Sequence, residues 1–173
     1  MLFRSTVRDF DGNVRPTPIS IVREQSGPTV HFLDMEIIQP MPGVCEVKMF
    51  DKRNNMPTLA AYRKFPHIET TISVRCKYAV LHSQLCRFSY RCTERQHFIK
   101  AAARLIREMY LHGYELKLLR RRLYNFQSTF WRTTKILVLP SSKRTRRMYW
   151  HLLTSEIYYE ATRPLVFSGS YDP

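Results

Sequence analysis

The sequence predicts an α+β protein in which an N-terminal β-hairpin packs on a three-helix, thumb-like bundle, with an extended arm before it and a C-terminal helix and tail after it. Apolar and polar residues alternate between positions 44 and 50, which is typical of a strand, and apolar residues recur about every 3.6 positions between 74 and 124, which is typical of helices. The composition, 44% hydrophobic and 13% aromatic in 173 residues, is sufficient for a core and unlike that of a disordered polycation.

Breaks in this pattern divide the chain into four segments. We expect an N-terminal arm (1–29), a β-hairpin segment (30–65), a basic helical domain (66–131) and a C-terminal extension (132–173). The arm is polar, carries the turn signal Asp11-Gly12-Asn13 and the extended segment 15–18, and is expected to contain a short strand over residues 19–22.

The hairpin segment is expected to hold two strands, over residues 30–38 and 44–50. Between them lies a five-residue loop, 39–43, which contains two prolines and Gly43. Prolines and glycines end strands and favour turns, so the two strands should form a β-hairpin.

Three helices are expected in the basic helical domain, over residues 74–90, 94–112 and 115–124. The first is marked by an apolar stripe with spacings of 4, 3, 4 and 3, namely Val74, Tyr78, Leu81, Leu85 and Phe88. Thr93-Glu94-Arg95-Gln96 matches a capping box at the start of the second helix. Gly113 is expected to end that helix, because glycine tolerates the left-handed conformation of a helix cap.

The C-terminal extension is expected to begin with a short buried strand over residues 136–139, just before Pro140. The charged segment 141–147 is either a loop or the start of a helix. A final helix should follow over residues 148–159, and the tail from residue 163 onward should be loose without a partner.

Positive charge is concentrated in one stretch of the chain. The formal net charge is +14, yet residues 75–147 alone hold 18 Lys or Arg against three acids, a net +15, while the other 100 residues sum to −1. A folded surface this positive repels itself unless an anion neutralises it. Arginine dominates the stretch, and its guanidinium group is suited to bidentate contacts with phosphate or carboxylate. We therefore expect either nucleic acid or an acidic protein subunit as partner.

The candidate nucleic-acid-binding residues lie on the third expected helix and in the segment behind it. They are Lys117, Arg120, Arg121, Arg122, Arg132, Lys135, Lys143, Arg144, Arg146 and Arg147. The aromatic residues Tyr124, Phe126, Phe130 and Trp131 are interleaved with them, and these rings either stack on bases or belong to the core.

Catalytic chemistry is not expected from this sequence. It contains no Gly-rich phosphate loop, nucleophile elbow, HExxH or paired-carboxylate motif, so we expect no enzyme activity, no cofactor and no metal site. Asp34 and Glu36, two apart on one expected strand face, either bind a cation or form a solvent-facing pair. The four cysteines are expected to be buried free thiols, because no secretory signal precedes them and their spacing does not match a zinc site. No stretch approaches the length of a membrane span.

Four short motifs occur in a characteristic order: Phe32-Leu33-Asp34, the hairpin end 47–53, Leu85-x-Arg87 and His112-Gly113-Tyr114. Over residues 30–126 this order resembles the end of the palm and the helix-turn-helix thumb of Penelope-like reverse transcriptases. The resemblance implies a hairpin and a helical unit that hold a nucleic-acid backbone. The family's catalytic Tyr-x-Asp-Asp turn has no counterpart here, and residues 72–75 depart from the family's pattern before the first helix. Two-metal phosphoryl transfer needs such acidic ligands, so polymerase activity should be absent.

Taken together, these features predict a non-catalytic basic structural protein that binds nucleic acid, with RNA favoured over DNA, within a large assembly such as a ribosome-like ribonucleoprotein. Two alternatives are a protein–protein scaffold, such as a minor structural component of a virus capsid, and the thumb subunit of a split reverse transcriptase. An intracellular location is expected, with a mitochondrion or a virion as open possibilities. The first eight residues faintly resemble a transit peptide, against which Asp9 and Asp11 argue.

Overall fold

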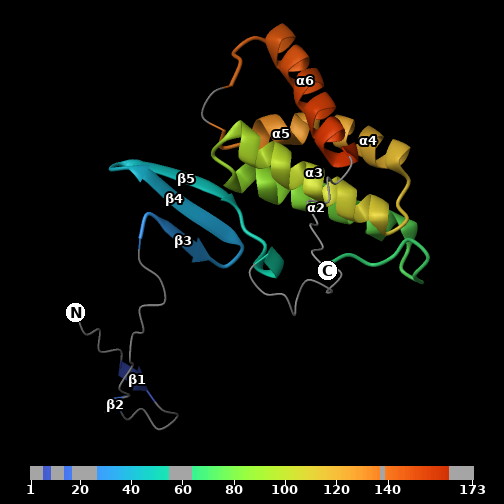
Figure 1. Cartoon of the computed structure of the whole chain (residues 1–173). Helices are drawn as coiled ribbons and strands as arrows, with labels where there is room; N and C mark the ends of the chain where they lie inside the picture. Colours follow the sequence, from blue (N-terminus) through green and yellow to red (C-terminus); the bar gives the residue numbers. More distant parts are fainter. Residues whose placement is uncertain (1–5, 9–13, 17–26, 55–63, 137–138, 164–173) are drawn as a thin grey trace, which may run out of the picture.

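The computed structural model describes residues 6–8, 14–16, 27–54, 64–136 and 139–163. Along the chain the elements are β1 (Thr6–Arg8), β2 (Val14–Pro16), β3 (Thr29–Phe32), β4 (Met35–Met41), β5 (Val44–Met49), the 3-10 helix η1 (Lys52–Asn54), α2 (Val74–Arg91), α3 (Arg95–Leu111), α4 (Leu116–Asn125), α5 (Gln127–Thr133) and α6 (Lys143–Thr162). The predicted α+β class is confirmed, since an antiparallel sheet precedes the helices (Figure 1). The strand expected over 19–22 and the tail beyond residue 163 lie outside the described residues.

β1 and β2 form a separate two-stranded antiparallel sheet within the N-terminal arm. The main sheet has three strands in the order β3-β4-β5, whereas the sequence predicted a two-stranded hairpin. The single strand expected over 30–38 is interrupted by a two-residue turn at Leu33 and Asp34, where Leu33 has a φ of 56°. The expected loop 39–43 shortens to Pro42 and Gly43, with Gly43 at a φ of 82°. A leucine in the left-handed region is rare, so no ordinary turn signal marked the first of these turns.

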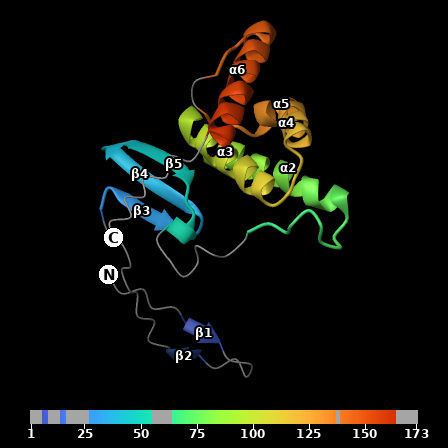
Figure 2. The same ribbon diagram turned by 45° about the vertical axis from the view of Figure 1, so that its right-hand side comes forward.

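The register of the sheet separates charged from apolar side chains. His31 pairs with Glu36 and Glu36 with Lys48 across the three strands, and Val30, Ile37 and Val47 pair on the opposite face. Every side chain of β3, β4 and β5 is half-buried or exposed. The sheet is therefore attached to the side of the helical unit rather than enclosed by it, as Figure 2 shows.

Helices α2, α3 and α4 lie within two residues of their predicted bounds. The predicted capping box at the start of α3 is wrong, because the N-cap residue is Glu94 and its side chain makes no capping hydrogen bond. The Thr93 hydroxyl instead accepts a hydrogen bond of 3.0 Å from the Val47 backbone N–H, and the Thr93 N–H donates to the Val47 carbonyl at 3.2 Å. Thr93 thus joins β5 to the loop between α2 and α3.

Gly113 ends α3 as predicted, with a φ of 84°. A Cβ atom at this position would lie 2.7 Å from Cγ2 of Ile68. Both the backbone conformation and the close approach of the segment before α2 therefore require glycine here.

The C-terminal extension contributes to the same core as α2–α5. Helix α6 begins at Lys143, five residues before its predicted start, and Ser142 caps it by accepting a hydrogen bond from the Thr145 N–H at 3.2 Å. Trp150, Leu153 and Ile157 of α6 are fully buried. Helix α5 was not predicted, and the boundary expected between residues 131 and 132 falls inside it. The expected three-helix bundle is thus a unit of five helices.

An aromatic cluster forms the centre of this unit. The rings of Phe98 and Phe130 lie 5.1 Å apart, and those of Phe130 and Trp150 lie 5.0 Å apart. The Trp150 indole N–H donates to the Tyr124 carbonyl at 3.0 Å, which satisfies a polar atom at the end of α4. Ile136 is buried, but neither Ile136 nor Leu139 is in a strand, and the two residues between them lie outside the described chain.

Candidate nucleic-acid interface

The ten predicted basic side chains are all exposed. Three of them lie on one stripe of α4, because Lys117, Arg120 and Arg121 are followed by Tyr124 at helical spacing. Leu119 and Leu123, on the other side of α4, are fully buried in the core. Because the apolar residues of α4 recur on one side of the helix and pack into the core, the basic residues on the other side face solvent.

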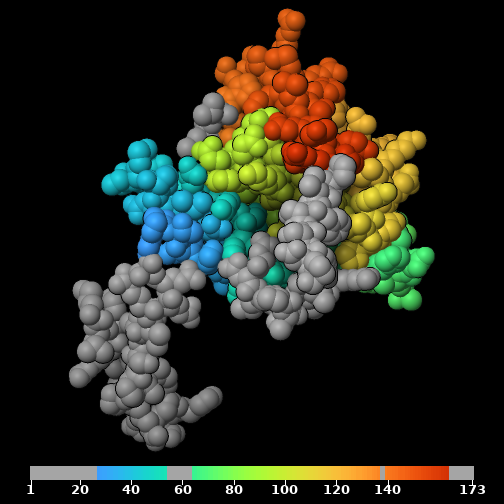
Figure 3. Space-filling view, viewed as in Figure 1, coloured from blue at the N-terminus to red at the C-terminus, as the bar shows by residue number. Residues whose placement is uncertain are grey.

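A groove of about 350 Å³ separates this stripe from α6. We call it the α4–α6 groove, and it is lined by Lys117, Arg120, Arg121, Tyr124, His151, Thr154 and Ser155. The Tyr124 hydroxyl and His151 Nε2 share a hydrogen bond of 3.1 Å across it. Figure 3 shows one face of the helical unit, with α6 lying across α3 beside α4.

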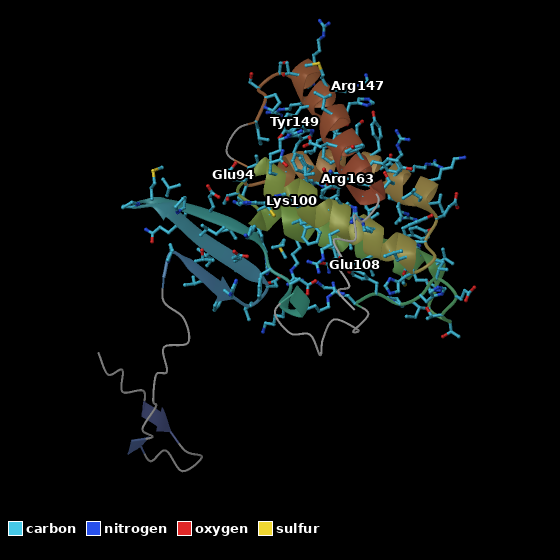
Figure 4. All side chains as sticks on the ribbon, in the orientation of Figure 1. Glu94, Lys100, Glu108, Arg147, Tyr149 and Arg163 are labelled. Carbon is cyan, nitrogen blue, oxygen red and sulfur yellow. The ribbon has the colours of Figure 1, made fainter. Side chains whose placement is uncertain are left out.

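Two further candidates extend the groove along α6. Arg147 and Arg144 precede His151 by four and seven residues, which places them on the same stripe of the helix. Figure 4 labels Arg147 in the first half of α6, away from the sheet. Five of the ten predicted cations therefore line or extend one groove.

The other five predicted cations lie elsewhere. Arg122 is on the side of α4 that faces α2, with its guanidinium 5.0 Å from the centre of the Tyr78 ring. Lys135 lies over Tyr90 near the end of α2, at 5.0 Å. The remaining members are Arg132 on α5 and Lys143 and Arg146 at the start of α6. The predicted set is thus a groove group and a scattered group rather than a single patch.

Acidic side chains divide the cations of the chain into two populations. Asp34 pairs with Arg87 and Arg91, Glu156 pairs with Arg95, and Asp51 and Glu108 pair with cations near the sheet. Within the described chain, none of the ten predicted residues forms an ion pair. Several cations at the sheet–helix junction therefore have acidic partners, whereas the groove cations have none among the described residues.

Besides Arg122 and Lys135, two more of these cations are oriented by ring contacts that do not neutralise them. The Arg120 guanidinium lies 4.8 Å from the centre of the Tyr158 ring, and that of Arg146 lies 5.7 Å from Trp131. Arg146 also donates from Nε to the Pro140 carbonyl at 2.9 Å. A guanidinium stacked on a ring keeps its edge donors available to phosphate oxygens.

Of the four aromatic candidates, Phe126 and Phe130 are 1% and 0% exposed and belong to the core. Trp131 is half-buried beneath Arg146. Tyr124 is 37% exposed and is the member of the four that lies in the groove. Sequence reasoning missed His151 and Tyr158, whose helical spacing from the α6 arginines could have indicated them.

The chain matches no family model, no curated protein and no solved structure. The resemblance to the thumb of Penelope-like reverse transcriptases therefore stays a prediction. In the described ranges no helix is long and apolar enough to cross a bilayer.

In the part of the chain that the structure describes, no group of three or more His, Cys, Asp and Glu side chains could hold a metal ion. Asp34 and Glu36 do not share a strand face, because Asp34 lies in the turn between β3 and β4. Asp34 pairs there with two arginines of α2, whereas Glu36 pairs with Lys48 at 2.9 Å. All four cysteines are free, as predicted, but not all are buried, since Cys45 and Cys76 are exposed.

Proposed function

We propose that this chain is a non-catalytic structural protein that binds the phosphate backbone of RNA through the α4–α6 groove, within a large ribonucleoprotein assembly. The observation that carries the proposal is the stripe of Lys117, Arg120 and Arg121, which is exposed and has no acidic partner among the described residues. A single helix supplies all three, so their spacing is set before a ligand arrives.

Backbone phosphate is the ligand that this arrangement recognises best. Neutralising each phosphate releases condensed counterions, which favours binding without any sequence preference. Tyr124 and His151 are exposed and line the groove, so unpaired bases can stack on their rings. This favours RNA over duplex DNA, because RNA presents unpaired bases in its loops, bulges and ends.

Salt-dependent binding to a single-stranded RNA oligonucleotide tests the proposal. The groove variant replaces Lys117, Arg120 and Arg121 by Gln, and its charge-matched control replaces Lys52, Arg75 and Arg163, which are exposed outside the groove. The slope of log affinity against log salt should be steep for the wild type. Each phosphate contact on a single strand contributes about 0.7 to this slope, so the loss of three cations should make it shallower by about 2 in the groove variant. The control should keep the wild-type slope. A flat wild-type response, or equal losses in the two variants, would falsify the proposal.

A scaffold that binds an acidic protein subunit, such as one in a virus capsid, is the second candidate function. It is favoured by a stripe of large apolar side chains on the outer face of α6, where Met148, Leu152 and Tyr159 are 61%, 61% and 64% exposed. Such a row beside unpaired cations is typical of a protein interface. Leu152→Glu should then abolish assembly with the subunit in nuclease-treated samples while leaving RNA binding unchanged.

A further inference from the structure

A second cavity, of about 190 Å³, lies where the sheet meets α2 and α3. It shares no residue with the α4–α6 groove. Its apolar lining comes from the end of the sheet, the segment before α2, and both helices: Met49, Phe50, Phe65, Phe88, Ala101 and Leu105. An apolar cavity of about 150 Å³ holds benzene, so this one has room for one planar ring system.

Charged residues line the same cavity. Lys48, Lys64, Lys100 and Arg104 supply four positive charges, and Asp51 and Glu108 supply two negative ones, which leaves a net charge of +2. The four cations come from β5, the segment before α2, and α3, so three separate parts of the chain converge on one opening. Figure 4 labels Lys100 and Glu108 along α3.

The two carboxylates already have partners within the protein: Arg104 pairs with each of them and Lys64 with Asp51, and the cation nearest to both is Arg53. Its Nη2 lies 2.6 Å from Oδ2 of Asp51 and 2.5 Å from Oε1 of Glu108. The pKa of Asp51 falls to about 2, mainly because of the hydrogen bonds from the Arg53 side chain. Lys100 is exposed and forms no ion pair in the described ranges. The lining therefore retains positive charge that the protein itself does not neutralise.

A polar atom of the cavity also lacks a partner. Nδ1 of His97, which lines the cavity, is buried and has no hydrogen-bond partner among the described residues. Buried polar atoms are nearly always paired, and an exception is often explained by a missing ligand or water. A ligand oxygen seated near His97 would satisfy this nitrogen.

We propose that this cavity binds a planar ring that carries a phosphate group, as in a nucleoside monophosphate. A phosphate monoester carries about −1.5 to −2 charge at neutral pH, which matches the excess charge of the lining. The phenylalanine rings and Met49 supply apolar surface for the planar ring. Lysines bind phosphate as point charges and need no fixed fork geometry, which suits the exposed Lys64 and Lys100.

Calorimetric titration of the full chain with uridine 5′-monophosphate tests this site. Uridine, ribose 5-phosphate and inorganic phosphate each present one half of the ligand. Each half should bind at least roughly tenfold more weakly than the whole, since each lacks either the charge-assisted contacts or the ring contacts. If inorganic phosphate bound as tightly as the nucleotide, the ring would contribute nothing, and the proposal of a nucleotide site would be wrong. Absence of binding at millimolar nucleotide would overturn the proposal.

Variants locate the binding in the cavity. Lys64→Gln with Lys100→Gln should weaken nucleotide binding by roughly tenfold or more, and Ala101→Phe should block the cavity. Replacing Lys52 and Arg75 by Gln changes the charge equally outside the cavity and should have no effect. The groove variant should bind the nucleotide normally, so this site and the RNA-binding groove can fail independently. If the cavity variants bind as tightly as the wild type, the site lies elsewhere and the inference is wrong.

Discussion

Asp34, in the turn between β3 and β4, forms an ion pair with Arg87 in the second half of α2. Arg91, one helical turn further along, donates to the same carboxylate. The Asp34 carbonyl also accepts a hydrogen bond of 2.8 Å from the Phe50 N–H. One residue thus connects the turn of the sheet, the strand end after β5 and α2.

Loss of the Asp34 carboxylate should therefore loosen the sheet from the helices. Partial burial already lowers the pKa of Arg87, so this cation is costly to leave without its partner. Asp34→Ala should reduce the free energy of unfolding by about 1–3 kcal/mol. Urea unfolding measures the loss, with Glu46→Ala as the control, because Glu46 forms no ion pair in the described chain. Equal stability of the two variants would mean that Asp34 does not hold the sheet.

Asp51 should make stability depend on pH in the acid range. Its pKa falls from 3.8 to about 2, mainly through the hydrogen bonds from Arg53, with further effects from the charges of Lys64 and Arg104. Because the folded state binds this proton less tightly than the unfolded state, the stabilisation is complete above pH 3.8 and is lost as the pH falls toward 2. The loss should amount to about 2 kcal/mol. Asp51→Asn should remove this part of the pH dependence, and an unchanged profile would contradict the assignment.

Gly113 and Gly43 allow the backbone and steric costs of a side chain to be separated. Both have positive φ, at 84° and 82°, but a Cβ at Gly113 meets Ile68 while one at Gly43 meets nothing within 4 Å. Gly43→Ala should cost about 1 kcal/mol of unfolding free energy, which is the backbone cost alone. Gly113→Ala should cost roughly 1–3 kcal/mol more, as overpacking usually does. Thermal unfolding of the two variants measures the difference, which should vanish if Ile68 can move aside.

Trp150 tests whether α6 belongs to the helical core. Trp150→Ala should destabilise the whole unit by about 3–5 kcal/mol, because the ring is fully buried against Phe130. Leu152→Ala, on the exposed face of the same helix, should change stability by no more than about 0.5 kcal/mol. Helical circular dichroism should show one transition at a lower denaturant concentration for Trp150→Ala. Two separate transitions would instead identify α6 as an independent extension.

The helices were the most predictable part of this fold. The apolar stripe of α2 and the glycine after α3 are local signals, and α2 and α3 begin and end within one residue of the predicted positions. The turn at Leu33 was not predictable, because a leucine with positive φ carries no turn signal. The role of Thr93 was also missed, since the Val47 backbone that it bonds lies 46 residues away. A contact between distant segments therefore decided the role of Thr93.

The candidate site was predictable in its residue types but not in its grouping. Charge counts indicated the ten cations, all of which are exposed. They could not indicate that Arg87 and Arg95 would be paired with acids from the sheet and α6, because pairing depends on tertiary contacts. The position of the aromatic residues among the basic ones also could not distinguish Tyr124, which is exposed, from Phe126 and Phe130, which are buried. Helical phase relative to the core makes that distinction.

Tyr124 should contribute to RNA binding by stacking on an unpaired base. Its ring lies in the groove between the α4 cations and His151, and removal of a stacking ring costs about 1–3 kcal/mol per base. Tyr124→Ala should therefore weaken binding to single-stranded RNA by roughly five- to 150-fold, and weaken binding to a perfect RNA duplex much less, because paired bases cannot reach the ring. Tyr159→Ala removes an equally large exposed ring from the outer face of α6 and should leave both affinities unchanged. Equal losses on single-stranded and duplex RNA would assign Tyr124 to groove structure rather than to stacking.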